Sequence, residues 1–445
     1  MNLSKASLQQ LSLLLQVLTP DDAELVGAGL TRDKRLHDVP DGTRCPNRGQ
    51  ARLPQEARGV SLTPRNCLKS GALIIAGLLF LLCTATQAAN YPITVTDLAG
   101  RSVTLPHAPQ RIVLQDSNVL LSLALLEGED PLARVVAWDN NLASSDPGLW
   151  NVVSQRWPQA DKIQDLDFPD TGQLDIESLL RTHPDLIVAR LSGRAAIENT
   201  VLNSVLERLG IPLIYVDNEL DPLANVPRSL ELLGQVLGRE DNANAYLQVY
   251  RRQLARLRET AAGLPAPKVF VEARAGQAGA GGCCHTQAHA GWGLLIKNLG
   301  AINLGSRYLR SESADVALET LILSKPDVYL MTGTQRLRNG VTAIPFGYGA
   351  NAGRINSEMQ RLMSRPGFSA TASSTKACVQ GLNHQFYNSV FNIVGAQWLA
   401  KIFWPEQFAD LDPDAEYRTL IREFTSLPDM PFVFHKQVCF TPVEG

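Results

Sequence analysis

Charged residues and cysteines are scarce in this chain of 445 residues. Only 19% of the residues are charged while 45% are hydrophobic. This balance excludes a wholly disordered protein, because such chains lack the apolar residues that form a core. Seven cysteines are too few for a disulfide-dense scaffold. The formal net charge of −3 excludes a generally basic nucleic-acid binder.

Long apolar runs are also scarce, which excludes a protein with several membrane spans. The single long run, Gly71 to Cys83, has thirteen uncharged residues. As a helix it would reach about 20 Å, which is shorter than the roughly 30 Å hydrocarbon core of a bilayer. Basic Arg65 and Lys69 precede the run, and small residues follow it up to Ala89. The pattern predicts a secretory signal peptide over residues 60–88, cleaved near Ala88. A retained membrane anchor and lipidation at Cys83 are the alternatives.

Residues 1–59 precede this predicted signal, although a signal peptide should begin a chain. We expect residues 1–59 to be disordered, or to result from a start codon assigned too far upstream. A genuine cytoplasmic extension is the alternative. Cleavage of the signal would leave a mature protein in the periplasm.

The mature chain alternates apolar strands with amphipathic helices, which is typical of an α/β fold with parallel sheets. Residues 91–105 begin it as a β-hairpin. We expect a first α/β lobe over residues 89–221 and a second over residues 264–445. The strands expected in the two lobes are 111–114, 134–138, 184–189, 210–216, 268–272 and 326–331. The helices expected are 118–127, 174–182, 198–209, 292–299, 318–323, 390–403 and 415–425.

Residues 222–263 carry apolar residues at helical spacing, and Pro265 ends the pattern. We predict a long helix here that joins the lobes rigidly, with a break or kink at residues 238–241. Each lobe also contains a helix end, then Pro-Asp, then an apolar strand, at Pro184-Asp185 and Pro326-Asp327. This weak internal repeat is consistent with two related lobes.

Polar and aromatic residues follow several predicted strands, where α/β lobes gather ligand groups. Arginine suits anionic chelates, and tryptophan and tyrosine offer faces to planar rings. The sequence therefore predicts a large, anionic, partly aromatic ligand; for each residue a plain structural role is the alternative. The candidate ligand-binding residues are Trp138, Arg190, Arg194, Arg274, His285, Trp292, Tyr348, His384 and Tyr387.

Adjacent Cys283 and Cys284, followed by His285 and His289, form a second unusual motif. Thiolates and imidazoles bind metals, but adjacent cysteines do not match the usual spaced pattern, and an oxidising periplasm favours disulfides. We therefore predict no metal site, and a bridge that tethers this loop to Cys378, although four cysteines allow three pairings. The disulfide candidates are Cys283, Cys284, Cys378 and Cys439.

An enzyme is the competing class of function: a periplasmic metal or redox protein that uses the Cys283-Cys284-His285 loop. The sequence contains no Gly-x-Ser-x-Gly elbow and no His-Glu-x-x-His stretch. We expect no catalytic residues.

The order of these features resembles a known family. Val95 to Val103 and the following residues to Val113 resemble its start, and Ala400 to Phe408 with Pro413 resemble its end. The chain is similar, over roughly residues 92–425, to the substrate-binding proteins of ABC importers for iron–siderophores, haem and cobalamin. The resemblance implies two Rossmann-like lobes joined by one long helix (the class III periplasmic binding fold), with the ligand in the cleft between them.

The resemblance also implies partners. It implies a siderophore-type ferric chelate as ligand, with haem or cobalamin as alternatives, no resident cofactor and no nucleic acid. It implies a monomer that docks on a permease of the inner membrane. One glutamate of each lobe, Glu177 and Glu319, would pair with arginines of that permease. The alternative is an ordinary carboxylate in the first turn of a helix, where it suits the helix dipole.

Overall fold

The computed structural model describes residues 91–168, 174–277, 283–338, 340–371 and 378–440. The predicted signal peptide and residues 1–59 lie outside the described residues. Among the residues described, no helix has both the length and the apolar character needed to span a membrane.

The first lobe begins with the predicted hairpin, formed by β1 (Ile93–Thr96) and β2 (Ser102–Leu105). Buried Asp97 fixes its turn: Oδ1 accepts the backbone N–H groups of Ala99 and Arg101 at 3.0 and 2.9 Å. The Arg101 guanidinium binds the other oxygen, Oδ2, at 2.7 Å. The turn conformation also requires Gly100, whose φ is +77°.

The sheet of the first lobe has five parallel strands in the order β5-β4-β3-β6-β7. The strand order reverses between β3 and β6, which makes a Rossmann-like switch point there. The strands are β3 (Ile112–Leu114), β4 (Val135–Trp138), β5 (Gln164–Asp165), β6 (Leu186–Arg190) and β7 (Leu213–Val216). The helices are η2 (Ser117–Val119), α3 (Leu120–Glu127), α4 (Asn141–Ser145), α5 (Pro147–Arg156), η3 (Pro158–Lys162), α6 (Ile176–Arg181), η4 (Leu191–Gly193), α7 (Arg194–Glu198) and α8 (Val201–Leu209).

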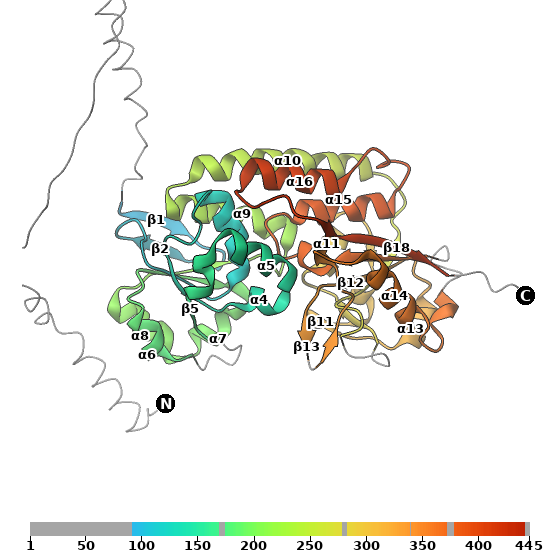
Figure 1. Cartoon of the computed structure of the whole chain (residues 1–445), viewed down its shortest axis with the longest axis horizontal. Helices are drawn as coiled ribbons and strands as arrows, with labels where there is room; N and C mark the ends of the chain where they lie inside the picture. The colour runs from blue at the N-terminus through green and yellow to red at the C-terminus, as the bar shows by residue number, and fades with distance from the viewer. Residues whose placement is uncertain (1–90, 169–173, 278–282, 339, 372–377, 441–445) are drawn as a thin grey trace, which may run out of the picture. The chain divides into compact units, whose positions relative to one another are not determined.

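The segment predicted as one long helix with a possible break is two helices, α9 (Pro222–Leu237) and α10 (Glu240–Ala261). Gly238, with φ +65°, ends α9 in a left-handed cap. α10 crosses between the lobes, and its 22 residues span about 33 Å. Asn242 near its start donates to the Leu126 carbonyl of α3, and Pro265 beyond its end accepts a hydrogen bond from Trp404. Figure 1 shows α10 beside α15 and α16.

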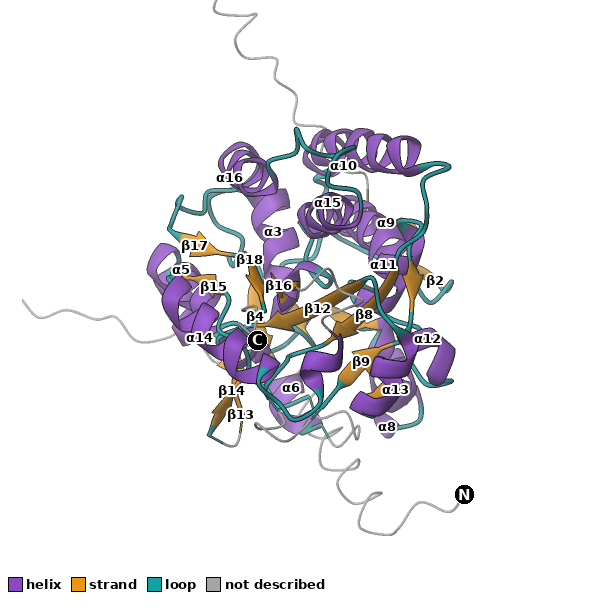
Figure 2. Ribbon diagram, turned by 90° about the vertical axis from the view of Figure 1, so that its right-hand side faces the viewer, coloured by secondary structure: helices purple, strands orange, loops and turns teal. Residues whose placement is uncertain are grey.

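The second lobe has a five-stranded sheet in the order β10-β8-β12-β16-β18, with β18 antiparallel at one edge. Its strand order reverses between β8 and β12, which makes a second switch point. Side chains of β8 alternate between two clusters: Val269 and Val271 join the core that contains α15, and Phe270 joins the core that contains α13 and α14. Helices therefore cover both faces of the sheet (Figure 2).

The strands of this lobe are β8 (Lys268–Glu272), β9 (His285–Gln287), β10 (Ile302–Asn303), β11 (Ser313–Asp315), β12 (Val328–Gly333), β13 (Leu337–Arg338), β14 (Val341–Thr342), β15 (Gly347–Tyr348), β16 (Cys378–Asn383), β17 (Phe432–Val433) and β18 (His435–Cys439). The helices are α11 (Trp292–Asn298), α12 (Gly305–Tyr308), α13 (Leu318–Ser324), α14 (Ala352–Met363), η5 (Phe368–Thr371), η6 (His384–Phe386), α15 (Asn392–Phe403) and α16 (Pro413–Phe424). The sequence analysis did not anticipate β16, β18 or α14.

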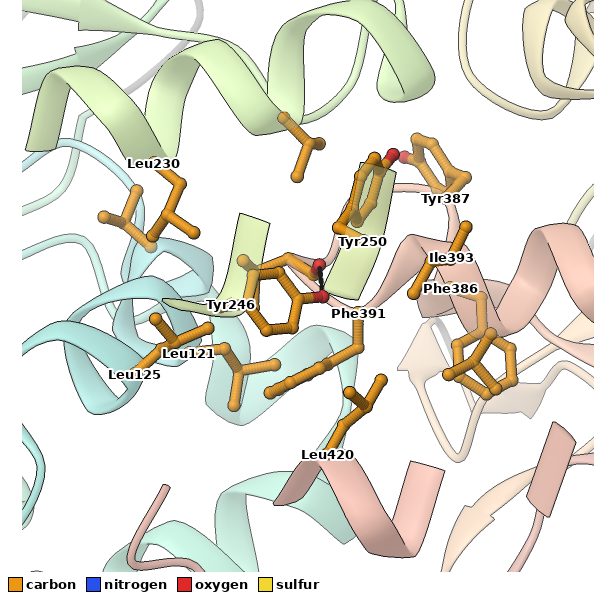
Figure 3. Close-up of a cluster of buried hydrophobic side chains, with 14 of the residues drawn as sticks. Leu121, Leu125, Leu230, Tyr246, Tyr250, Phe386, Tyr387, Phe391, Ile393 and Leu420 are labelled. Atoms are coloured by element: carbon orange, nitrogen blue, oxygen red, sulfur yellow. Dashed lines mark hydrogen bonds between the residues drawn. The ribbon is translucent and has the colours of Figure 1, made fainter. Parts of the chain in front are cut away.

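One hydrophobic core joins the lobes beneath α10 (Figure 3). Tyr246 of α10 lies at its centre, fully buried, and donates its hydroxyl proton to the Val390 carbonyl at 2.6 Å. The edge of the Phe391 ring meets Tyr246 at 5.8 Å between centroids, while Leu121 of α3 and Leu420 of α16 complete the cluster. This shared core opposes a large hinge motion, because opening the lobes would expose it to water.

The disulfides differ from the predicted tether. Cys378 pairs with Cys439, which lies directly opposite it where β16 meets β18. Cys283 and Cys284 are bonded to each other. The predicted bridge from the 283–284 loop to Cys378 is therefore not formed. The pairing of β16 with β18 places Cys439 opposite Cys378, and Cys439 takes the place of that loop as the partner.

Candidate functional site

Charged residues lie at the switch points of both sheets. In the first lobe, Asp116 follows β3 and Arg190 ends β6; the Arg190 Nε lies 3.8 Å from the Asp116 Oδ2. In the second lobe, Arg274 follows β8 with a φ of +52°, and its backbone N–H donates to Thr332 of β12. Ligands of open α/β sheets bind at such switch points, so we call the space between these residues the cleft.

The two lobes touch at the base of the cleft. Thr334 of the second lobe donates to the Ser145 carbonyl of the first at 2.8 Å, and Gln385 donates to the Ser145 hydroxyl at 3.2 Å. Asn388 lines a cavity of about 10 Å³ together with Asp116 and Arg190. This cavity has room for about one water molecule.

Arg190 is held between two carboxylates in the first lobe. Its Nη1 lies 3.8 Å from Glu219, opposite the contact with Asp116. Asp116 is buried and accepts three hydrogen bonds on Oδ1, two from Asn118 and one from Asn141. Burial raises the pKa of Asp116 and of Glu219, although Arg190 acts in the opposite direction on both. The first-lobe side of the cleft is therefore acidic overall.

Asp139, which follows β4, adds to this acidic side. Partial burial, and secondarily the nearby Asp116, raise its pKa to about 6. The group therefore gains or loses its charge close to neutral pH.

The second-lobe side of the cleft is basic. Buried His384 accepts or donates a 2.7 Å hydrogen bond between its Nδ1 and the Thr332 hydroxyl, and its Nε2 has no hydrogen-bond partner within the described chain. Burial lowers the pKa of His384 well below its usual value, and Arg274 and Arg336 nearby lower it further. His384 is therefore neutral, and the positive charge on this side comes from the arginines.

Tyr387 lies against His384, with 5.0 Å between the ring centroids. Burial raises the pKa of its hydroxyl to about 12, while Glu219 raises it and Arg274 lowers it. Tyr387 therefore lies between the acidic and the basic side of the cleft, with a protonated hydroxyl.

A larger cavity of about 380 Å³ opens near Glu219, which accepts a hydrogen bond from Ser192 of the cavity lining. Ser192, Arg194 and Glu198 line it from the first lobe, and Glu312 lines it from the second. Arg194 is 40% exposed and forms an ion pair with Glu198 at 2.9 Å. The volume falls within the range of small-molecule sites in proteins.

Three of the nine predicted ligand-binding residues are covered by protein near the cleft, and a fourth is exposed on the surface. Trp138, Trp292 and Tyr348 are buried: Trp138 packs against the ring of Trp150, the Trp292 indole donates to the His384 carbonyl, and Tyr348 is bonded to Tyr417. Their ring faces are covered by protein. His285 is exposed and binds Asp315 at 2.8 Å. The structure places Arg190, Arg194 and Arg274 at the cleft or at the cavity beside it, and His384 and Tyr387 are buried next to them.

Asp116, Glu219 and Glu312 were not among the predicted site residues. Asp116 follows the first strand of the sheet, and Glu219 follows the last. Applying the rule of strand carboxyl ends to every strand would have found both. Glu312 reaches the cavity from a loop before β11 and carries no local signal.

Glu177 and Glu319 are exposed in the first turns of α6 and α13. Asp175 caps α6 by accepting the Ser178 N–H. Glu177 forms an ion pair with Arg181. Figures 1 and 2 both place α6 and α13 away from α10.

Known sequences place the chain among binding proteins. Residues 112–376, more than half of the chain, match the model of the periplasmic binding protein family. The ferric enterobactin-binding periplasmic protein FepB of Escherichia coli O6:H1 is 30% identical over 196 residues, 43% of this chain and 57% of FepB. The uncharacterized ABC transporter substrate-binding lipoprotein YvrC of Bacillus subtilis is 24% identical over 38% of this chain and 48% of YvrC. The matched region thus spans about half the length of these relatives.

Solved structures share the fold. The TroA-like periplasmic binding protein FepB of Veillonella parvula aligns with a TM-score of 0.70 and 23% identity over 78% of this chain and 99% of its own. Helicobacter pylori CeuE, solved as a nickel–histidine complex, aligns with a TM-score of 0.55 and 16% identity over 76% and 96%. This chain therefore belongs to the periplasmic binding protein family and has its two-lobed, helix-joined fold.

Proposed function

We propose that this protein is the periplasmic substrate-binding component of an ABC importer, and that it carries an anionic ferric chelate of the siderophore type. Membership of the family supports the binding role. The partial match to a ferric enterobactin-binding protein supports an iron chelate. The iron is cargo in this proposal, and the protein has no catalytic step.

The observation that carries the proposal is an arginine at each switch point. Arg190 ends β6 and Arg274 follows β8, so the two arginines lie at the switch points of opposite lobes. Arginine pairs with carboxylate and catecholate-type oxygens through its planar fork of donors. Tyr387 lies between them with a protonated hydroxyl.

The charge asymmetry of the cleft orients the ligand. Arg190 lies between Asp116 and Glu219, whereas Arg274 lies near a neutral histidine. The anionic face of a chelate would therefore contact the second lobe. Arg194 would contact the part of the chelate that lies in the 380 Å³ cavity. The acidic side would receive hydrogen-bond donors of the ligand.

Transfer to the permease would use Glu177 and Glu319. Each is an exposed carboxylate near the start of a helix that precedes a Pro-Asp strand, one in each lobe. Two fixed carboxylates on separate lobes would set the orientation of the protein on a positively charged partner. Export would use the signal peptide predicted at residues 60–88.

Tryptophan fluorescence of the purified protein tests the proposal. Trp138 lies beside the acidic residues of the cleft, and Trp292 bonds to His384, so a bound iron complex should quench both. The titration uses ferric hydroxamate, catecholate and carboxylate chelates, haem, cobalamin and free divalent metals. We expect saturable quenching by one ferric chelate at an equimolar end point.

Arg274→Gln should weaken that binding at least tenfold, because it removes one charge-assisted contact. Arg208→Gln, an exposed arginine in the last turn of α8, is the matched control and should bind as wild type. Saturation by haem or cobalamin alone would refute the ferric chelate. Equal affinity in Arg274→Gln and wild type would refute the assignment of the cleft.

A further inference from the structure

Three potential metal ligands converge in the second lobe, at the end of β8. The sulfur atoms of Cys283 and Cys284 and a carboxylate oxygen of Glu272 all lie within 4.8 Å of one another. Cys284 and Glu272 are buried, whereas Cys283 is half-buried and gives access from the surface. The three residues come from β8 and from the segment that enters β9.

The third ligand is not the one that the sequence motif suggests. His285 follows the cysteines directly, but it lies on the surface and binds Asp315. Residues adjacent in a strand point to opposite faces, so His285 points away when Cys284 points inward. The third ligand is instead Glu272, which is distant in sequence. It is the last residue of β8, and its carboxylate lies close to both cysteine sulfurs.

Buried groups around the site hold these ligands in place. The Tyr329 hydroxyl lies 2.8 Å from a Glu272 oxygen and 3.3 Å from the Cys284 sulfur. Arg365 binds both Glu272 oxygens, at 2.8 and 2.7 Å. A carboxylate has about four lone-pair positions, so Glu272 can accept these bonds and still coordinate an ion. Such outer partners orient metal ligands and tune their affinity.

Charge balance indicates the kind of ion. Two thiolates and one carboxylate carry three negative charges, and Arg365 supplies one positive charge. One divalent cation would cancel the remaining two, which a buried site requires. Thiolate ligands favour thiophilic ions such as Zn²⁺ and Cd²⁺ over Mg²⁺ or Ca²⁺.

We propose that Cys283, Cys284 and Glu272 form a binding site for one thiophilic divalent cation when the cysteine pair is in its dithiol state. In the structure the pair is a disulfide, which cannot bind such an ion in this way. A small dithiol reductant opens it by exchange: the reductant supplies two electrons and two protons, becomes a disulfide itself and leaves two protein thiols. The cation then displaces two protons from these thiols as the two metal–sulfur bonds form.

The test is an anaerobic titration with Cd²⁺ as the probe. The full chain is treated with dithiothreitol, desalted and assayed for free thiols before and after the metal is added. We expect an ultraviolet sulfur-to-cadmium charge-transfer band that saturates at one equivalent. The untreated disulfide form should lack this band.

Variants assign the band, because the chain holds five other cysteines. Cys283→Ser should lose it, and Cys378→Ser, the matched control, should keep it. Glu272→Gln should weaken binding at least tenfold. Since Glu272→Gln leaves Arg365 without its carboxylate and can unfold the lobe, cadmium X-ray absorption of the wild type provides a second measurement, with two sulfurs and at least one oxygen expected.

A band that survives in Cys283→Ser would overturn the proposal. So would a missing band in protein whose Cys283 and Cys284 thiols are shown to be free by mass-spectrometric labelling. X-ray absorption that shows only sulfur atoms bound to the cadmium would overturn the role of Glu272. None of these outcomes depends on binding of a chelate in the cleft.

Discussion

Arg190 and Asp116 face each other at 3.8 Å where the strand order of the first sheet reverses. An arginine therefore lies where a ligand is expected to bind, but the carboxylate of Asp116 already balances its positive charge. Glu219 adds a second compensating carboxylate. The affinity of the cleft for an anion should therefore depend on the charge of these acids.

Asp116→Asn should tighten the binding of an anionic ferric chelate by about three- to tenfold. The change removes one negative charge beside Arg190, an effect on the order of 1 kcal/mol at a partly solvated site. The asparagine side chain keeps an oxygen that can accept the Asn118 and Asn141 hydrogen bonds. Fluorescence titration measures the affinity, with the exposed Asp161→Asn as control. Unchanged or weaker binding in a folded Asp116→Asn protein would contradict the prediction.

Binding of the same chelate should tighten as the pH falls from 8 to 5.5. Asp139, whose pKa burial raises to about 6, takes up a proton in this range. Protonation removes negative charge from the acidic side of the cleft. The measurement is a series of titrations with a chelate whose own charge is constant over the range. Asp139→Asn should show a shallower pH dependence; an identical slope in both proteins would count against this explanation.

Asp146→Asn should abolish one pH-dependent contribution to stability. Asp146 is buried where the lobes meet, caps α5, and has a pKa that burial raises to about 6 from 3.8. The folded state therefore holds this proton more tightly than the unfolded state. The resulting stabilisation is complete below about pH 4 and is lost as the pH rises through about 6, by at most about 3 kcal/mol.

Urea denaturation between pH 4 and 7.5 checks this prediction. The free energy of unfolding of Asp146→Asn should fall less with rising pH than that of the wild type. Asp412→Asn is the matched control, because Asp412 is an exposed N-cap that also precedes a proline. Parallel curves for wild type and Asp146→Asn would show that Asp146 does not titrate in this range.

The double variant Cys378→Ser, Cys439→Ser should lose about 3–4 kcal/mol of unfolding free energy. The bridge closes a loop with a sequence separation of 61, and loops of this size restrict the unfolded chain by about 4 kcal/mol in the chain-entropy model. Chemical denaturation under non-reducing conditions measures the loss. Cys283→Ser is a useful comparison, because a bridge between adjacent residues closes almost no loop and its removal should cost far less. Equal losses in both proteins would refute the loop-closure argument.

Glu177→Ala with Glu319→Ala should cut uptake of the ligand by cells at least tenfold and leave its affinity unchanged. Both carboxylates are exposed and lie outside the cleft, so they can contact a permease without contacting the ligand. Radioactive iron uptake and fluorescence titration are measured in parallel. Glu423→Ala, exposed on α16, is the control. Wild-type uptake by the double variant, or an equal loss of affinity and uptake, would exclude the docking role.

Local sequence patterns were sufficient to predict most helices and strands of the first lobe. The hairpin, the strands at β3, β4, β6 and β7, and the cap at Asp175 follow from short-range periodicity and capping chemistry. The break in the segment over residues 222–263 also followed from Gly238. The second lobe was predicted less completely, since β16 and β18 pair across 61 residues and no local signal announces such a pairing.

The candidate site shows the same division. Arg190 and Arg274 could be assigned from their places after strands, because parallel strands end at one edge. Trp138 and Trp292 follow the same rule in sequence, yet the structure buries both. Sequence position gives the edge of the sheet on which a side chain lies, but the packing of its neighbours decides whether its ring is covered.

The sequence by itself determined the α/β class, the two lobes and the arginines at the strand ends, because each depends on residues close together in the chain. Only the tertiary structure decided that Asp116 and Glu219 compensate Arg190, that Cys378 pairs with Cys439, and that Glu272 rather than His285 joins the adjacent cysteines. Each of these contacts joins residues that different elements carry. Their positions depend on strand order and register, which many distant apolar contacts fix together.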